Sequence, residues 1–195
     1  MQKIVPRWEW RSFGSDFGEA EARFASLAAE AEQESDEIYL LSPVCDANVK
    51  IRDALMDIKM LEQVNAAGLE QWCPVMKAGF PLTPDEAKKV CATLGVAAPS
   101  TARATFTLEQ LQAELVAPPR GVRVVSVHKR RLRYQIEGCM SEMTELVADG
   151  AKARTVALEA EDARRVIDTV RALGLGELAN TSYPRGLKQL IGMKS

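Results

Sequence analysis

The chain has 195 residues, of which 47% are apolar and 27% charged, and its formal net charge is −2. This length and composition predict a globular protein with one sizeable core, which we expect to form a single domain over residues 1–195. No run of 18 apolar residues is present and the first residues lack the apolar stretch of a signal peptide, so we expect no transmembrane helix, no membrane partner and a cytoplasmic location.

The cysteine and histidine content argues against the common zinc and nucleophile sites. Cys45, Cys73, Cys91 and Cys139 are widely and irregularly spaced, and His128 is the only histidine. Zinc sites need clusters of these residue types, and a Ser-His or Cys-His site would depend on His128, which stands among cations. We expect the cysteines to be reduced and packed as small apolar side chains.

The first part of the chain predicts a strand, a helix and a second strand. Charged and aromatic residues alternate over residues 7–13, which predicts a strand with Arg7, Glu9 and Arg11 on one face. Alanines and apolar residues at helical spacing then predict a helix from residue 15 to about residue 35. A short strand follows over residues 37–41.

The next strands carry cations on alternate positions. A hairpin is predicted over residues 49–52 and 56–61, and a further strand over residues 72–80. The cations on their polar faces are Lys50, Arg52, Lys59 and Lys77. Two capping boxes, which begin at Thr83 and Thr107, predict helices over residues 83–94 and 107–115.

The last part of the chain predicts three more strands and two helices. The longest strand covers residues 122–137 and carries Lys129, Arg131 and Arg133 on one face. Strands are also expected over residues 140–147 and 154–161, and the second of these places Glu159 and Glu161 on one face. Helices over residues 162–173 and 183–191 complete a chain of about eight strands and five helices. This order predicts an α+β protein built on an antiparallel sheet or barrel.

The charges are unevenly distributed, which suggests a localised anion site. Acids concentrate between Asp16 and Glu37, whereas six cations and no acid lie between Arg120 and Arg133. On an open sheet the alternating cations would form a solvated face. In a closed barrel they would point inward and would need a compensating anion, which a polyphosphate supplies because Arg and Lys bind phosphate oxygens. The pair of Glu159 and Glu161 is either a hard-oxygen metal site or an exposed strand end before a helix.

In their order along the chain, these features resemble the CYTH superfamily, the triphosphate tunnel enzymes. The residues that carry the resemblance are Lys50-Ile-Arg52 for its alternating basic strand, Met56-Asp-Ile-Lys59 for its lysine strand, Val127-His-Lys129-Arg-Arg131 for its Arg/Lys strand and Ala157-Leu-Glu159-Ala-Glu161 for its late acidic strand. The resemblance covers nearly the whole chain. It implies a closed or nearly closed antiparallel β-barrel of about eight strands, a tunnel, with helices packed outside.

The resemblance also implies an activity and its residues. The tunnel would bind an inorganic polyphosphate, a triphosphate or a triphosphate-bearing small molecule and would hydrolyse a phosphoanhydride bond with Mg²⁺ or Mn²⁺. The implied phosphate-binding residues are Arg11, Lys50, Arg52, Lys59, Lys77, Lys129, Arg131 and Arg133. The implied catalytic residues are Lys59, Arg131, Glu159 and Glu161, and the implied metal ligands are Glu9, Glu159 and Glu161.

The opening motif departs from the Glu-x-Glu-x-Lys of the family, because Arg7 and Arg11 replace its first Glu and its Lys. This change favours an alternative function, a polyphosphate-binding module without catalysis. A second alternative is RNA binding by the basic strand. Trp8, Trp10 and Trp72 do not interleave with that strand as stacking platforms, so nucleic acid is not the expected partner. A third alternative, adenylate cyclase chemistry, is permitted by the resemblance. The oligomeric state stays open, a homodimer included.

Overall fold

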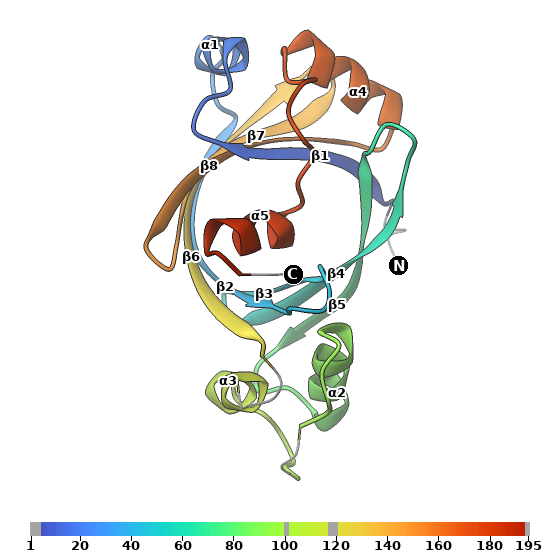
Figure 1. Ribbon diagram of the computed structural model, residues 1–195, viewed down its shortest axis with the longest axis vertical. Coiled ribbons are helices and arrows are strands. Elements are labelled where there is room, and N and C mark those ends of the chain that lie inside the picture. Colours follow the sequence, from blue (N-terminus) through green and yellow to red (C-terminus); the bar gives the residue numbers. More distant parts are fainter. Residues whose placement is uncertain (1–4, 100–101, 117–120, 194–195) are drawn as a thin grey trace.

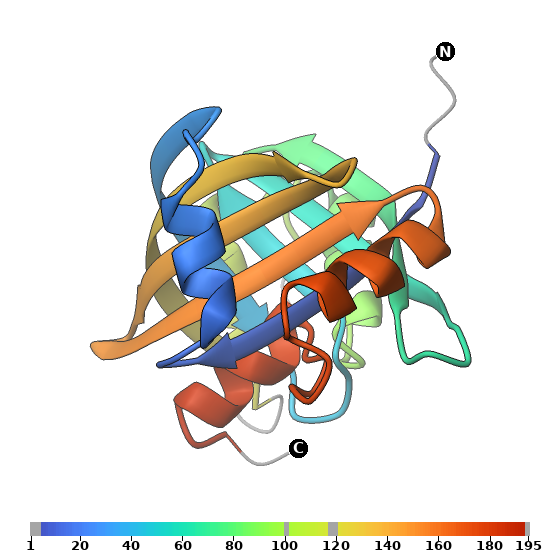
Figure 2. The same ribbon diagram turned by 90° about the horizontal axis from the view of Figure 1, so that it is seen from above.

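Eight strands form a closed antiparallel barrel in the computed structural model, which describes residues 5–99, 102–116 and 121–193 (Figures 1 and 2). The strands are β1 (Arg7–Gly14), β2 (Ala31–Leu41), β3 (Asn48–Arg52), β4 (Leu55–Val64), β5 (Glu70–Gly79), β6 (Arg123–Ile136), β7 (Cys139–Ala148) and β8 (Ala151–Ala160). Their order around the barrel is β1-β5-β4-β3-β2-β6-β7-β8, and pairing of β8 with β1 closes it. The predicted fold class and closed barrel are confirmed.

Four of the helices pack outside the barrel and one covers an opening. The helices are α1 (Glu19–Ala25), α2 (Pro84–Thr93), α3 (Leu108–Val116), α4 (Ala163–Ala172) and α5 (Tyr183–Leu190). One outer core joins α1 and α4 to β1, β6 and β8, and another joins α2 and α3 to β3 and β4. Helix α5 instead lies across one opening of the ring of strands (Figure 1). Among the described residues, no helix is long and apolar enough to cross a membrane.

The helix predicted over residues 15–35 is wrong in its second half. Helix α1 ends at Ala25, and Ala31–Leu41 forms strand β2, which pairs with β6 along its whole length. The acidic run therefore lies beside the basic run, and Arg130 Nε donates a hydrogen bond to Glu32 Oε1 at 2.6 Å. Opposite charges on neighbouring strands stabilise this pairing, which outweighs the helix propensity of the alanines. Arg120, the first cation of the basic run, lies outside the described residues.

Alternation along β6 decides which side chains enter the barrel. Val125, Val127, Lys129 and Arg131 are buried, whereas the residues between them include the exposed His128. This period of two is the one expected for a strand with a covered inner face. Val127 packs in an apolar cluster with residues of α5. The barrel interior is therefore apolar beside α5 and charged further in.

Helix α5 approaches β1 so closely that only glycine fits at one position. A Cβ atom built on Gly186 would overlap the ring of Phe13, which faces the interior from β1. Glycine inside a helix costs about 1 kcal/mol relative to alanine. This local cost is offset by the packing of neighbouring Tyr183 and Leu187, which are buried against β2, β6 and β7.

We predict that Gly186→Ala lowers the free energy of unfolding by about 1–2 kcal/mol, because the overlap with Phe13 outweighs the gain in helix propensity. Gly176→Ala is the matched control, since its Cβ would meet no atom within 4 Å. Urea unfolding of both variants measures the difference. A Gly186→Ala protein as stable as the control would show that α5 does not need this close approach.

Candidate functional site

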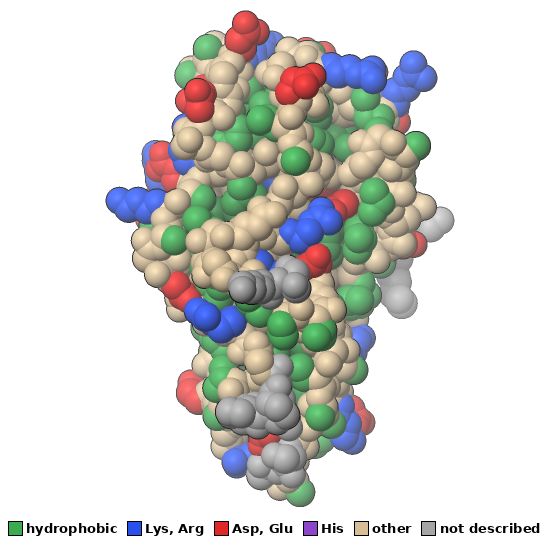
Figure 3. Space-filling view, in the orientation of Figure 1, with side chains coloured by type: hydrophobic (Ala, Val, Ile, Leu, Met, Phe, Trp, Pro, Cys, Tyr) green, Lys and Arg blue, Asp and Glu red, His purple; other side chains and the backbone are tan. Residues whose placement is uncertain are grey.

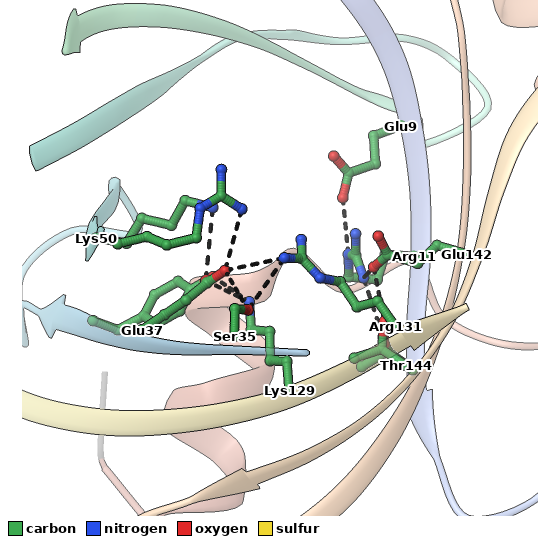
Figure 4. A network of polar contacts seen from close by, with 12 residues as sticks. Glu9, Arg11, Ser35, Glu37, Lys50, Lys129, Arg131, Glu142 and Thr144 are labelled. Atoms are coloured by element: carbon green, nitrogen blue, oxygen red, sulfur yellow. Dashed lines mark hydrogen bonds and ion pairs between the residues drawn. The ribbon is translucent and has the colours of Figure 1, made fainter. Parts of the chain in front are cut away.

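A buried carboxylate surrounded by cations lies inside the barrel (Figure 4). The side chain of Glu37, on β2, is completely buried. Four cations from β3 and β6 lie within 4 Å of its oxygens: Lys129 at 2.8 Å, Arg52 at 3.5 Å, Arg131 at 3.6 Å and Lys50 at 3.7 Å. We call these five residues the Glu37 cluster.

Hydroxyl groups on the same face of β2 hold the Glu37 cluster in place. Lys129 Nζ donates to the Tyr39 hydroxyl at 2.7 Å, and that hydroxyl donates to Glu37 Oε2 at 3.1 Å. Ser35 Oγ donates to Glu37 Oε1 at 3.3 Å and accepts from Arg131 Nη2 at 3.2 Å. Ser35, Glu37 and Tyr39 share this face because side chains alternate along a strand. The carboxylate is therefore fixed by neutral donors as well as by cations.

The electrostatics of the Glu37 cluster favour an ionised carboxylate. Burial disfavours the charged form of Glu37, but the nearby Lys129, Lys50 and Arg131 outweigh burial and lower its pKa to about 2. Burial also lowers the pKa of Lys129 below its ordinary value, and contact with Glu37 only partly opposes this shift. Glu37 does not neutralise four cations by itself. Asp53 also lies 3.8 Å from Arg52 but is exposed, so the buried part of the cluster carries a positive surplus that an incoming anion would compensate.

A second group of ion pairs continues the site toward β1 and β7. Arg11 is buried, donates to Glu9 Oε1 at 2.9 Å and to Thr155 Oγ1 at 3.1 Å, and lies 3.6 Å from Glu142. Burial disfavours the charged form of Glu142. Arg11, a hydrogen bond from Thr144 and the charges of Arg131 and Lys129 together outweigh burial and lower the pKa of this carboxyl group. Arg131 is the member of the Glu37 cluster that lies next to this second group (Figure 4).

Solvent reaches the charged interior from one side. The exposed fraction of the side chain rises from 2% at Lys129 through 30% at Arg52 to 42% at Arg7. On the opposite side, α5 lies across the opening (Figure 1). In the space-filling view from that side, backbone and side-chain atoms occupy the region inside the ring of strands (Figure 3). The charged groups therefore line a site that deepens from Arg7 toward Lys129.

Three carboxylates form a row across β5, β1 and β8. Glu9 is the cross-strand partner of Glu70 on one side and of Glu159 on the other. Each carboxylate accepts a hydrogen bond from an arginine, and these pairs are Glu70 with Arg185, Glu9 with Arg11 and Glu159 with Arg7.

The chemistry of Glu9 and Glu159 fits a divalent cation, because Mg²⁺ is held by one or two carboxylates together with phosphate oxygens. An arginine engages each of them in this arrangement, and a metal ion would have to displace it. No group of three or more His, Cys, Asp or Glu side chains in the described ranges is arranged to hold a metal. Mg²⁺ or Mn²⁺ at this site therefore stays a prediction.

Comparisons with known proteins agree with this geometry at the level of the fold. No protein-family model and no curated protein matches the sequence. A putative adenylyl cyclase from Hippeastrum, described as having a dominant triphosphatase activity, is 12% identical; the match covers 98% of this chain and 97% of that one with a TM-score of 0.51. The chain has the CYTH-like fold.

Two archaeal structures match the fold of this chain to a similar degree. A conserved hypothetical protein from Pyrococcus furiosus is 15% identical, with 91% of this chain and 98% of that chain covered and a TM-score of 0.51. A protein from Pyrococcus horikoshii OT3 is 16% identical, with 91% and 97% covered and a TM-score of 0.50. At these identities the likeness concerns the fold alone.

The barrel brings together most of the site residues that were predicted from the sequence of this chain. Arg11, Lys50, Arg52, Lys129 and Arg131 take part in the two ion-pair groups, and Glu9 lies beside Glu159. Lys59 and Lys77 reach the same face from β4 and β5, because Lys59 is paired with Asn48 and Lys77 with Asp57. Arg133 and Glu161 are less involved: both are exposed, and Glu161 lies beyond the end of β8.

Sequence reasoning missed Glu37, Glu142 and Tyr183. The strand containing Glu37 was expected to begin at that residue, so its shared face with Ser35 and Tyr39 was not recognised. Glu142 alternates with Thr144 on β7, and that period of two was a usable signal. Tyr183 reaches the interior only because α5 crosses the barrel opening, and no local pattern encodes this position.

We predict that Glu37→Gln lowers the free energy of unfolding at neutral pH by on the order of 3 kcal/mol, given a folded-state pKa of about 2 against an ordinary value of 4.5. A lowered folded-state pKa gives stability that is complete above the pKa of the unfolded chain and is lost as the pH falls through the folded value. The difference between wild type and variant should therefore shrink as the pH falls from 4.5 to about 2.

Urea unfolding at a series of pH values measures this difference. Glu145→Gln is the matched control, because Glu145 is an exposed carboxylate that lies 3.7 Å from Arg130 on the outer surface. The control should differ little from wild type at any pH. A Glu37→Gln penalty that stays constant down to about pH 2 would contradict an ionised Glu37 in the folded protein.

Proposed function

We propose that this protein binds an inorganic polyphosphate, or a small molecule bearing a triphosphate, inside the barrel and hydrolyses a phosphoanhydride bond. The observation that carries the proposal is the convergence of Lys50, Arg52, Lys129 and Arg131 on one interior point whose carboxylate compensates only one of them. Bringing so many cations out of water is unfavourable unless an anion compensates them. The triphosphatase activity described for the Hippeastrum protein of the same fold supports this choice of anion.

The arrangement suits a linear ligand with several charges. Arg52 and Arg131 can each hold two phosphate oxygens through a planar guanidinium, whereas Lys50 and Lys129 act as point charges. Lys59, which is half-buried on β4, and Lys77, which is exposed on β5, lie on the same face, and Arg133 stands exposed further along β6. A ligand with one phosphate would meet only part of this set, so we expect affinity to rise with the number of phosphates.

The proposed hydrolysis assigns roles to cations and carboxylates. Lys59 and Arg131 would stabilise the charge that develops on the transferred phosphoryl group. Glu9 and Glu159, together with Glu161, would hold Mg²⁺ or Mn²⁺, which supplies positive charge to phosphoryl oxygens. Arg11 would position Glu9, to which it donates a hydrogen bond.

A second candidate function is binding without turnover. It is favoured by the ion pair of Arg7 with Glu159 at 3.0 Å and by that of Arg11 with Glu9 at 2.9 Å. Two of the three carboxylates proposed for the metal are therefore already neutralised by guanidinium groups. In this case the arginines would take the place of the metal as positive charge, and tripolyphosphate would bind tightly in the presence of a chelator and stay intact.

We predict that Arg131→Ala and Lys59→Ala each weaken binding of tripolyphosphate by about 1–3 kcal/mol, the value of a hydrogen bond to a charged group. Arg130→Ala is the matched control, because Arg130 precedes Arg131 on the same strand but points outward and pairs with Glu32. Isothermal titration calorimetry with tripolyphosphate measures all three. Equal affinities of Arg131→Ala and Arg130→Ala would show that the barrel interior is not the phosphate site.

We predict that Glu159→Gln abolishes phosphate release that depends on Mg²⁺ or Mn²⁺ while it leaves metal-free binding of tripolyphosphate intact, because a hard oxygen ligand is removed. Glu161→Gln tests the other carboxylate of the motif, and Glu145→Gln, on the outer surface, is the control. Colorimetric phosphate assays with a metal titration give the answer. If the wild-type protein binds tripolyphosphate but releases no phosphate at any metal concentration, the second candidate function, binding without turnover, is correct.

A further inference from the structure

Helix α5 brings an aromatic hydroxyl group into the charged interior. The Tyr183 ring is stacked on Tyr39 with centroids 5.6 Å apart, and its faces contact two cations: Lys129 Nζ lies 3.8 Å and Arg11 Cζ 4.5 Å from its centroid. These contacts place Tyr183 between the Glu37 cluster and the Arg11 group. The ring is held by cation–π contacts on the deep side of the site.

The Tyr183 hydroxyl is buried and has no hydrogen-bond partner, and the same is true of Arg131 Nε. Both residues are more than nine-tenths buried, at 7% and 6% exposure. Buried polar groups are nearly always hydrogen-bonded, and leaving one unsatisfied costs about 1–3 kcal/mol. Two unsatisfied donors in one interior therefore point to an acceptor that is supplied from outside the chain.

We infer that the Tyr183 hydroxyl and Arg131 Nε donate hydrogen bonds to the terminal phosphoryl group of the ligand, so that a polyphosphate is bound by its end. The inference rests on the proposed function and adds to it which part of the ligand is recognised. A terminal phosphoryl group offers three oxygens that accept hydrogen bonds, one more than an internal phosphoryl group of the chain. Burial raises the pKa of Tyr183 above its ordinary value, so at neutral pH the hydroxyl keeps the proton that it would donate.

The position of α5 supports binding by the end. One turn beyond Tyr183 on α5, Leu187 is completely buried in a cluster with Val125, Val127 and Leu146. This cluster forms an apolar floor that closes the deep end of the site. On the other side the exposed fraction of the charged side chains rises toward Arg7, where solvent enters. A polyanion cannot pass through an apolar floor, so a chain that enters past Arg7 presents its terminal group to Tyr183.

The two ligands that test this inference share three linked phosphates and differ in their ends, so tripolyphosphate also carries more negative charge and the variant Tyr183→Phe decides the role of the hydroxyl. Tripolyphosphate has free terminal groups, whereas in diadenosine triphosphate both terminal phosphates are esterified. Titration calorimetry in the presence of a chelator should give wild-type affinity for tripolyphosphate at least about tenfold higher than for diadenosine triphosphate. Equal affinity for the two ligands would overturn binding by the end.

Tyr183→Phe tests the hydroxyl, and Tyr134→Phe is the matched control because Tyr134 is buried on the outer face of β6 against Phe24. Tyr183→Phe should weaken tripolyphosphate binding about tenfold and leave the weak binding of diadenosine triphosphate unchanged, whereas the control should match wild type. Arg131→Lys keeps the charge but lacks the Nε donor, and it should also lose affinity for tripolyphosphate.

Stability separates a binding role from a structural one. Tyr183→Phe removes a hydroxyl that has no partner, so the urea midpoint of the unliganded protein should stay unchanged or rise. A lower midpoint, or wild-type affinity of Tyr183→Phe for tripolyphosphate, would overturn the inference while the proposed function stands. Failure of wild-type protein to bind tripolyphosphate would instead refute the proposed function, and the inference with it.

Discussion

Placing charge inside a closed barrel is the constraint on which this structure depends. The buried carboxylate of Glu37 reduces the repulsion among Lys50, Arg52, Lys129 and Arg131 enough for the strands to close around them. Without an internal anion, four converging cations would oppose folding in the absence of ligand. A fully compensated set, however, would have no affinity for an anion. With one carboxylate among four cations, the repulsion is low enough for the barrel to fold, and the remaining positive charge still attracts an anion.

Helix α5 divides the same interior into two environments. Its apolar residues fill one end of the barrel against β2 and β6, and Tyr183 forms the boundary with the charged part. Val127 belongs to the apolar side, which explains why a strand otherwise rich in cations has valine there. Charge is also compensated in the row of carboxylates on β5, β1 and β8. Each of Glu9, Glu70 and Glu159 accepts a hydrogen bond from an arginine side chain.

Most strands and the identity of the main interior cations could be predicted because period-two alternation is a local signal. This alternation includes Lys50, Arg52, Lys129 and Arg131. The order of these residues along the chain is enough to suggest the CYTH-like barrel. Most helices could be predicted because capping residues and apolar residues at helical spacing are local signals too. The start of β2 could not be predicted, since its stability comes from charges on β6 that are about a hundred residues away. Glu37 and Tyr183 were missed for the same reason: their roles depend on pairing and on the placement of α5, which are long-range.

The tie between Arg11 and the segment before α5 has a consequence for synthesis of the protein. The backbone N–H of Arg11 donates to Asn180 Oδ1, and its carbonyl accepts from the N–H of Thr181. Strand β1 also pairs with β8, so nearly the whole chain separates the partners that close the barrel. Such non-local pairing slows folding. The anion site therefore cannot be enclosed until β8 and the segment up to Thr181 have been synthesised, and a shorter nascent fragment has no closed interior in which to bind cellular phosphates.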